Sequence, residues 1–270
     1  MAEPWRTLLT LGAGLVTGVL SGMFGIGGAV VSNPAIRALG ASPIHSVGST
    51  LPSILPSAIS GALRYHREGL LRLRVVAWTG FPGAVAAVGG SLLTTAVPDA
   101  RILTISIAVL MVYTAVRTAR AARIDAVAPG DEREVASEFV DPPPARDGWV
   151  LLVAIGLVAG LFSGLLGIGG GLLMVPAFTG LVRLPLKETL GTSLACVGVI
   201  ALPGTVTHAL LGHVDWGFAI PLSIAVIPGA RIGAGLAIKA SDRVLRLTVA
   251  IGLSAVAAVY ATTELAALIG

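Results

Sequence analysis

A glycine-broken apolar segment occurs twice in this chain and constrains its fold more than any other feature. Residues 14–36 read GLVTGVLSGMFGIGGAVVSNPAI, and residues 156–178 read GLVAGLFSGLLGIGGGLLMVPAF. Twelve of these 23 aligned positions are identical, at a constant offset of 142 residues. Both copies are interrupted at the same place by Gly-Ile-Gly-Gly. The duplication therefore predicts two related halves, each containing a broken apolar element.

The composition identifies the solvent of this chain as a membrane. Apolar residues make up 55% and charged residues 12% of the sequence, against about 25% charged residues in an average soluble protein. The mean hydropathy is +0.91. Long apolar runs between short polar loops predict an all-α, polytopic helical membrane protein. The net charge of +4 is explained by basic loops flanking the spans, so no nucleic-acid partner is expected.

A single polar stretch divides the chain. Residues 123–148 combine mixed charge with a proline run, which is typical of a solvated linker. It separates a first transmembrane repeat, residues 1–122, from a second, residues 149–270. Eight apolar elements are expected, at residues 7–39, 44–63, 74–97, 101–117, 149–182, 187–211, 216–238 and 244–263. The repeat continues beyond the glycine segment, because residues 48–51 (GSTL) correspond to residues 191–194 (GTSL).

The distribution of Lys and Arg discriminates between two topologies. If all eight elements cross once, the basic residues outside the spans divide 10 to 7 between the two sides. If residues 7–39 and 149–182 instead turn back at their glycines, each half has three crossings and the halves are inverted. The division is then 14 to 3, with only Arg6, Arg37 and Arg101 on the poorer side. The positive-inside rule favours the second topology, with the linker in the cytoplasm and each repeat built from a broken, re-entrant-like hairpin plus three transmembrane helices.

The glycine breaks are the main candidate binding elements. Gly14, Gly18 and Gly22, and their counterparts Gly156, Gly160 and Gly164, are spaced for close helix packing. The break residues themselves, Gly25, Gly27, Gly28, Gly167, Gly169 and Gly170, destabilise a helix by about 1 kcal/mol each. Non-helical backbone at membrane depth is tolerated only where it is buried within the protein or lines a water-filled cavity. The half-helix that follows presents free N–H groups and a partial positive charge, which suits an anion.

Polar residues within the apolar elements supply the remaining candidates. Ser49, Thr50, Thr192 and Ser193 offer hydroxyls at repeat-matched positions, although bonding within their own helices is an equally good explanation. Arg231 lies eight residues before Lys239 and could grip an oxyanion, or could extend to the membrane surface. His208 is a candidate proton relay. No Ser-His-Asp set, carboxylate pair or metal-ligand spacing occurs, so neither enzymatic activity nor a metal or other cofactor is expected.

The paired segments FSGLLGIGGGLLMVPAF and LSGMFGIGGAVVSNPAI, each followed by a Gly-Ser/Thr-Thr/Ser-Leu helix, resemble those of the TauE/SafE family of sulfite exporters and sulfonate permeases. The resemblance covers residues 8–265 apart from the linker. It implies an inner-membrane carrier, often an exporter, of sulfite, sulfonates or related organosulfur anions. One departure is Ala29, which stands where the family usually has the last glycine of the first copy.

These observations predict a secondary transporter of small oxyanions. The substrate is expected between the two breaks, and rocking of the inverted halves would give alternating access. The expected partners are a small anionic substrate, the lipid bilayer and protons or another coupling ion, and a homo-oligomer is compatible with the sequence. An anion channel with the same lining and a non-transporting membrane scaffold are the two alternatives.

Overall fold

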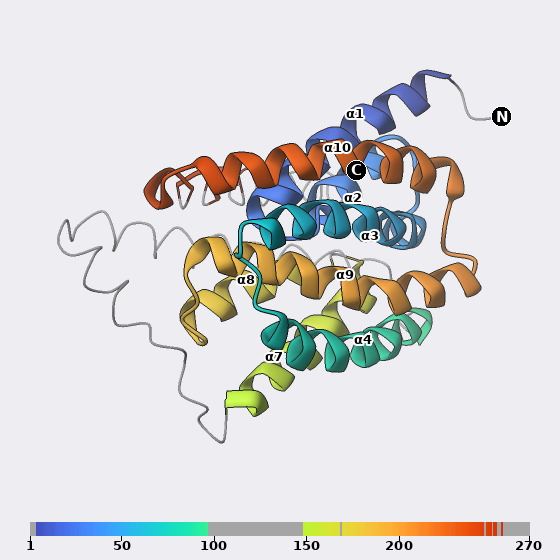
Figure 1. Ribbon diagram of the computed structural model, residues 1–270. Coiled ribbons are helices and arrows are strands. Elements are labelled where there is room, and N and C mark those ends of the chain that lie inside the picture. Colours follow the sequence, from blue (N-terminus) through green and yellow to red (C-terminus); the bar gives the residue numbers. More distant parts are fainter. Residues whose placement is uncertain are drawn as a thin grey trace.

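The computed structural model describes residues 4–96, 148–167 and 169–245, together with 247–249, 251, 252 and 255. The helix expected at 101–117, linker residues 123–147 and most of the helix expected at 244–263 lie outside this part of the chain. Every regular element in the described part is a helix (Figure 1). Five of these helices are long and apolar enough to cross a membrane: Pro4–Phe24, Leu73–Thr94, Gly148–Leu166, Leu186–Leu210 and Trp216–Lys239.

The two long apolar elements are each divided in two, as their glycines predict. The first forms α1 (Pro4–Phe24) and α2 (Ala29–Ala38), and the second forms α7 (Gly148–Leu166) and α8 (Gly171–Gly180). Helix α2 turns back along α1, because Gly28 lies beside Thr17 and Ser21, and Gly40 lies beside the Arg6 side chain. The chain therefore returns toward the end of α1 at which it entered.

Four further helices complete the described bundle: α3 (Pro43–Arg67), α4 (Leu73–Ala96), α9 (Leu186–Leu210) and α10 (Trp216–Lys239). Their ends follow ordinary capping chemistry. The Ser42 side chain accepts a hydrogen bond from His45 N ahead of a proline at the first helical position of α3. The Asp215 carboxylate accepts one from Gly217 N at 2.8 Å at the start of α10.

The longest helix contacts join one half of the chain to the other. Helix α1 runs parallel to α10 along Gly14, Gly18 and Gly22, where any Cβ would overlap the backbone or a side chain of residues 222–234. Helix α7 runs parallel to α4 in the same way, with Gly156 against Thr79 and Gly160 against Gly83. The expected role of these glycines in close helix packing is confirmed.

The directions of the remaining helices follow from their contacts. Helix α3 is parallel to α10, because Gly48 lies beside His213 and Ser60 bonds Ile227 O, whereas Gly61 beside Leu194 makes it antiparallel to α9. Helix α9 is in turn parallel to α4, with Thr192 beside Arg72 and Val199 beside Gly80. Helices α1, α3 and α10 therefore run one way, and α4, α7 and α9 run the other way.

The two ends of this bundle differ in charge. The end where α3 and α10 finish and α4, α7 and α9 begin is here called the basic face. Its Lys and Arg residues in the described part of the chain are Arg64, Arg67, Arg72, Arg74, Arg183, Lys187, Lys239 and Arg243. The opposite face carries Arg6 and Arg37. Outward-pointing apolar side chains cover the helices between the faces, as on Ile220, Ile224 and Ile232 of α10, which is expected of a surface in contact with lipid.

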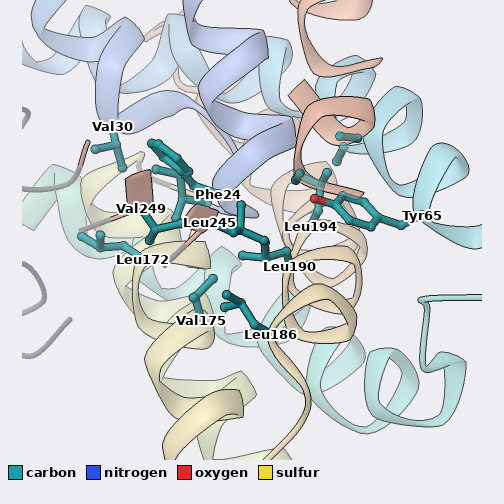
Figure 2. Close-up of a cluster of buried hydrophobic side chains, with 14 of the residues drawn as sticks. Phe24, Val30, Tyr65, Leu172, Val175, Leu186, Leu190, Leu194, Leu245 and Val249 are labelled. Carbon is teal, nitrogen blue, oxygen red and sulfur yellow. The ribbon is translucent and has the colours of Figure 1, made fainter. Parts of the chain in front are cut away.

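The core is shared by both halves. Figure 2 shows one buried cluster in which Phe24 and Val30 of the first half pack near Leu172 and Leu190 of the second. Tyr65 closes its other end and donates a hydrogen bond of 2.9 Å to Gly22 O. A second cluster surrounds Ile54 and Val197 and includes Met174 and Phe178 of α8.

Candidate functional site at the paired glycine breaks

The two breaks adopt the same backbone conformation. Gly25, Gly27 and Gly28 have φ angles of +68°, +81° and +80°, and Gly167, Gly169 and Gly170 have φ angles of +66°, +76° and +72°. Side-chain-bearing residues are disfavoured in this left-handed region by roughly 1–2 kcal/mol each. Gly28 and Gly170 are the N-cap residues of α2 and α8, and both helices begin without a side-chain cap. The sequence Gly-Ile-Gly-Gly is thus required by backbone geometry as well as by space.

The breaks meet halfway along α3 and α9. A methyl group on Gly27 would lie 2.5 Å from Val197 Cγ1, and one on Gly169 would lie 3.1 Å from both Val197 Cγ1 and Ile54 Cδ1. Ile54 and Val197 are each the twelfth residue of a 25-residue helix and are fully buried. A Cβ on Gly171 would lie 2.6 Å from Ile26 Cα, so the two breaks also touch directly.

The meeting point contains two half-helix N-termini. The first N–H groups of α2 and of α8 have no acceptor within their own helices, and each helix is 10 residues long. The aligned peptide dipoles place a partial positive charge at both N-termini. In the structure the space between the breaks is filled by the side chains of Ile54 and Val197. These two residues are called the Ile54–Val197 pair below.

The four predicted hydroxyls all bond to backbone in the other half of the chain. Ser193 Oγ donates to Gly25 O at 2.8 Å, and Thr50 Oγ1 lies 3.3 Å from Gly167 O as well as 3.0 Å from Val47 O. These bonds satisfy carbonyl groups that the breaks expose. Thr50 and Ser193 are therefore at the breaks, where their hydroxyl protons are already engaged by protein.

Ser49 and Thr192 point elsewhere, although they precede Thr50 and Ser193 by one residue. Ser49 Oγ accepts from Asp215 N at 2.8 Å, and Thr192 Oγ1 accepts from Arg72 N at 3.1 Å. Both hydroxyls thus anchor the loops that lead into α10 and α4. They lie toward opposite faces of the bundle, away from the meeting point of the breaks.

Other buried hydroxyls lie beside the breaks. Thr17 and Ser32 in the first half, and Ser163 in the second, have side-chain oxygens that are buried with no hydrogen-bond partner in the described structure. Thr17 Cγ2 would be 2.7 Å from a Cβ on Gly28, and Ser21 beside it accepts a bond of 2.8 Å from Ser57. Sequence reasoning missed Thr17 and Ser32, because copy two has Ala159 and Met174 at their positions and repeat symmetry gave no signal.

His208 is fully buried and lies next to the second break. Its Nε2 is 3.0 Å from Gly164 O, three residues before Gly167, and its Nδ1 is 3.1 Å from His213 Nδ1. Since a carbonyl can only accept, Nε2 carries the proton, and Nδ1 accepts from His213. His213 lies in the loop between α9 and α10, where burial and the nearby His45 lower its pKa. The two rings thus connect the opposite face to α7.

Arg231 is not brought to the breaks. It is exposed on α10 and lines a surface pocket with Arg64 and Lys239. Arg64 lies ten residues beyond Ile54 on α3, which corresponds to about 15 Å along the helix axis. Within the described residues, no cluster of His, Cys, Asp and Glu could hold a metal ion.

Comparison with known proteins agrees with this membrane architecture. The family model for the sulfite exporter TauE/SafE matches residues 10–260, and the chain belongs to that family. It is similar to two Bacillus subtilis proteins named probable membrane transporter proteins. YunE is 26% identical over 83% of this chain and 84% of its own length, and YjnA is 27% identical over 88% and 92%. A probable membrane transporter protein of Xylella fastidiosa is 26% identical over 94% of both chains. No solved structure matches the chain. The protein is thus a multi-pass membrane transporter of the TauE/SafE family.

Proposed function

We propose that this protein is a secondary transporter that exports small oxyanions, of the sulfite and sulfonate class, by alternating access of two inverted repeats. The observation that carries the proposal is the meeting of two uncapped half-helix N-termini at buried glycine breaks, halfway along α3 and α9. Paired broken helices with their N-termini at the midplane are a recurrent solution for binding an anionic group in secondary transporters.

The helix directions support the inverted-repeat part of the proposal. In the described part of the chain, three long helices of the first half run opposite to their counterparts in the second: α1 against α7, α3 against α9 and α4 against α10. Their contacts correspond as well, since Gly25 packs on Leu190 where Gly167 packs on Val47. The excess of Lys and Arg on the basic face supports an orientation with that face in the cytoplasm.

The anion would be held mainly by backbone. The N–H groups of Ala29 and Val30, and those of Gly171 and Leu172, can donate to oxyanion oxygens without an intrahelical bond being lost. The unpartnered hydroxyls of Thr17, Ser32 and Ser163 are further donors. The Ile54–Val197 pair closes the site, so binding requires the two halves to separate at this pair from one face at a time.

A proton is the coupling ion that the side chains support best. His208 bonds both to the loop residue His213 and to the carbonyl of Gly164 on α7. Protonation of His208 Nδ1 would end its role as the acceptor from His213, so this bond would have to break or to reverse through a tautomer change of His213. The charge state of His208 would thereby be linked to the position of α7 and of the break that follows it.

Counterflow in proteoliposomes tests this function. Vesicles loaded with sulfite should accumulate labelled sulfite or taurine against a gradient, whereas acetate should not exchange. Thr17→Val should reduce apparent sulfite affinity about 10-fold, the value of one charge-assisted hydrogen bond. Thr10→Val is the matched control, because the Thr10 hydroxyl is occupied by Arg6 O of its own helix at 2.7 Å. Flux without counterflow would identify a channel, and stabilisation or movement of cations only would refute the anion site.

A further inference from the structure

A basic pocket lies between α3 and α10, apart from the glycine breaks. It has a volume of about 320 Å³ and is lined by Arg64 of α3 and by five residues of α10, namely Arg231, Ile232, Gly235, Leu236 and Lys239. Arg231, Gly235 and Lys239 follow each other at four-residue spacing, so they form one stripe along α10. A Cβ on Gly235 would meet no atom within 4 Å, which means that the floor of the pocket is open above this glycine.

The pocket has more positive than negative charge. Arg64 lies 3.2 Å from Glu68, and both side chains are partly exposed. No carboxylate pairs with Arg231 or Lys239 within the described residues. Arg231 lies two helical turns, or about 12 Å, inside the end of α10. An arginine at this depth is costly without a counter-ion, so the pocket calls for an anion located at the boundary between headgroups and hydrocarbon.

The surroundings of the pocket are those of a lipid. Ile232 and Leu236 line it, and exposed Ile59 and Leu63 of α3 and Ile227 of α10 continue the apolar surface toward the membrane centre. A small water-soluble anion would make no contact with this apolar surface, whereas the acyl chains of a phospholipid would cover it. Guanidinium groups bind phosphate through two parallel hydrogen bonds, and Lys239 adds a point charge.

We propose that the pocket of Arg64, Arg231 and Lys239 is a binding site for an anionic phospholipid, with the phosphate between the three cations and the acyl chains along α3 and α10. Its position on the basic face agrees with this, because basic pockets between transmembrane helices are typical sites for anionic headgroups. The site does not depend on the proposed oxyanion transport.

Native mass spectrometry and thermal melting of the full-length protein test the site, with phosphatidylglycerol and phosphatidylcholine of identical chains as probes. Phosphatidylglycerol should remain bound and raise the melting temperature, and phosphatidylcholine should do neither. The double variant Arg231→Gln, Lys239→Gln should bind phosphatidylglycerol at least about 10-fold more weakly. Arg74→Gln is the matched control, because Arg74 is exposed on the same face and does not line the pocket.

Gly235→Leu gives a second test that does not alter charge. The leucine Cβ would meet no atom within 4 Å, and the side chain would occupy the pocket and favour the helix. The variant should therefore melt normally without lipid and lose the stabilisation by phosphatidylglycerol. The proposal is overturned if both variants bind phosphatidylglycerol like the wild type. It is also overturned if inorganic phosphate or sulfite displaces the lipid at equal concentration, since the site would then serve a water-soluble anion.

Discussion

The contact between Gly27 and Val197 can be measured as a coupling energy. Gly27→Ala introduces two costs. First, the backbone of the new alanine must keep a φ angle of +81°, which costs about 1–2 kcal/mol. Second, its methyl group would lie 2.5 Å from Val197 Cγ1, and this overpacking costs about 1–3 kcal/mol more. Gly69→Ala isolates the first cost, because Gly69 has φ of +72° and no atom within 4 Å of a Cβ. The difference between the two variants is therefore the packing cost of the break.

Thermal melting in lipid-containing detergent gives this difference, at about 2–4 °C per kcal/mol for a chain of this size class. Val197→Ala removes Cγ1, the atom that the new methyl group would overlap. Combined with Gly27→Ala it should therefore recover most of the stability lost to overpacking, and combined with Gly69→Ala it should recover none. The expected coupling energy is about 1–3 kcal/mol. Equal melting of Gly27→Ala and Gly69→Ala, together with additive effects of Val197→Ala, would refute the meeting of the breaks at the Ile54–Val197 pair.

Three further variants test the surroundings of the breaks. Ser193→Ala leaves Gly25 O buried without its donor and should destabilise the protein by about 1–3 kcal/mol in thermal melting, whereas Thr205→Ala, which loses only a bond within its own helix, should be nearly neutral; equal effects would contradict the bond between the halves. Because the pKa of His213 is lowered in the folded protein, the unfolded chain binds a proton first as the pH falls through about 6.5. The melting temperature should therefore decline on acidification, and it should decline less steeply in His213→Gln. An identical pH profile of the melting temperature in the variant would contradict this. Glu188→Gln breaks an exposed, bidentate ion pair with Arg72 and should lower the free energy of unfolding by less than about 1 kcal/mol. In 1 M salt the variant and the wild type should melt at the same temperature, because the pair is already screened.

The positions of the breaks could be predicted from the sequence, because two copies of Gly-Ile-Gly-Gly reveal both the interruption and its partner. The sequence could also predict that the interruption has a backbone cause, since only glycine adopts positive φ at low cost. Which atoms face the breaks was not predictable in the same way. Thr192 is the repeat counterpart of Ser49, the residue that precedes Thr50. The Thr50 hydroxyl nevertheless lies at Gly167 O of the second break, whereas the Thr192 hydroxyl accepts from Arg72 N in a loop.

The placement of Arg231 shows a different limit. Its repeat counterpart is Val85, so symmetry said nothing about the direction of its side chain. That direction depends on which face of α10 is covered by α1 and which by α3, and the contact with α1 is set by small residues such as Gly229 and Gly233. The unpartnered hydroxyl of Thr17 was hidden for the same reason, because Ala159 occupies its place in the second copy.

The pairing of α1 with α10 affects how the protein is made. The stripe of Gly14, Gly18 and Gly22 has its partner about 200 residues later in the chain, which a ribosome translating 5–20 residues per second reaches after roughly 10–40 s. During that interval α1 lies in the bilayer with its small-residue face against lipid or against the insertion machinery. Neither half can complete its own packing before the other is inserted. Insertion of α10 therefore also covers the small-residue face of α1.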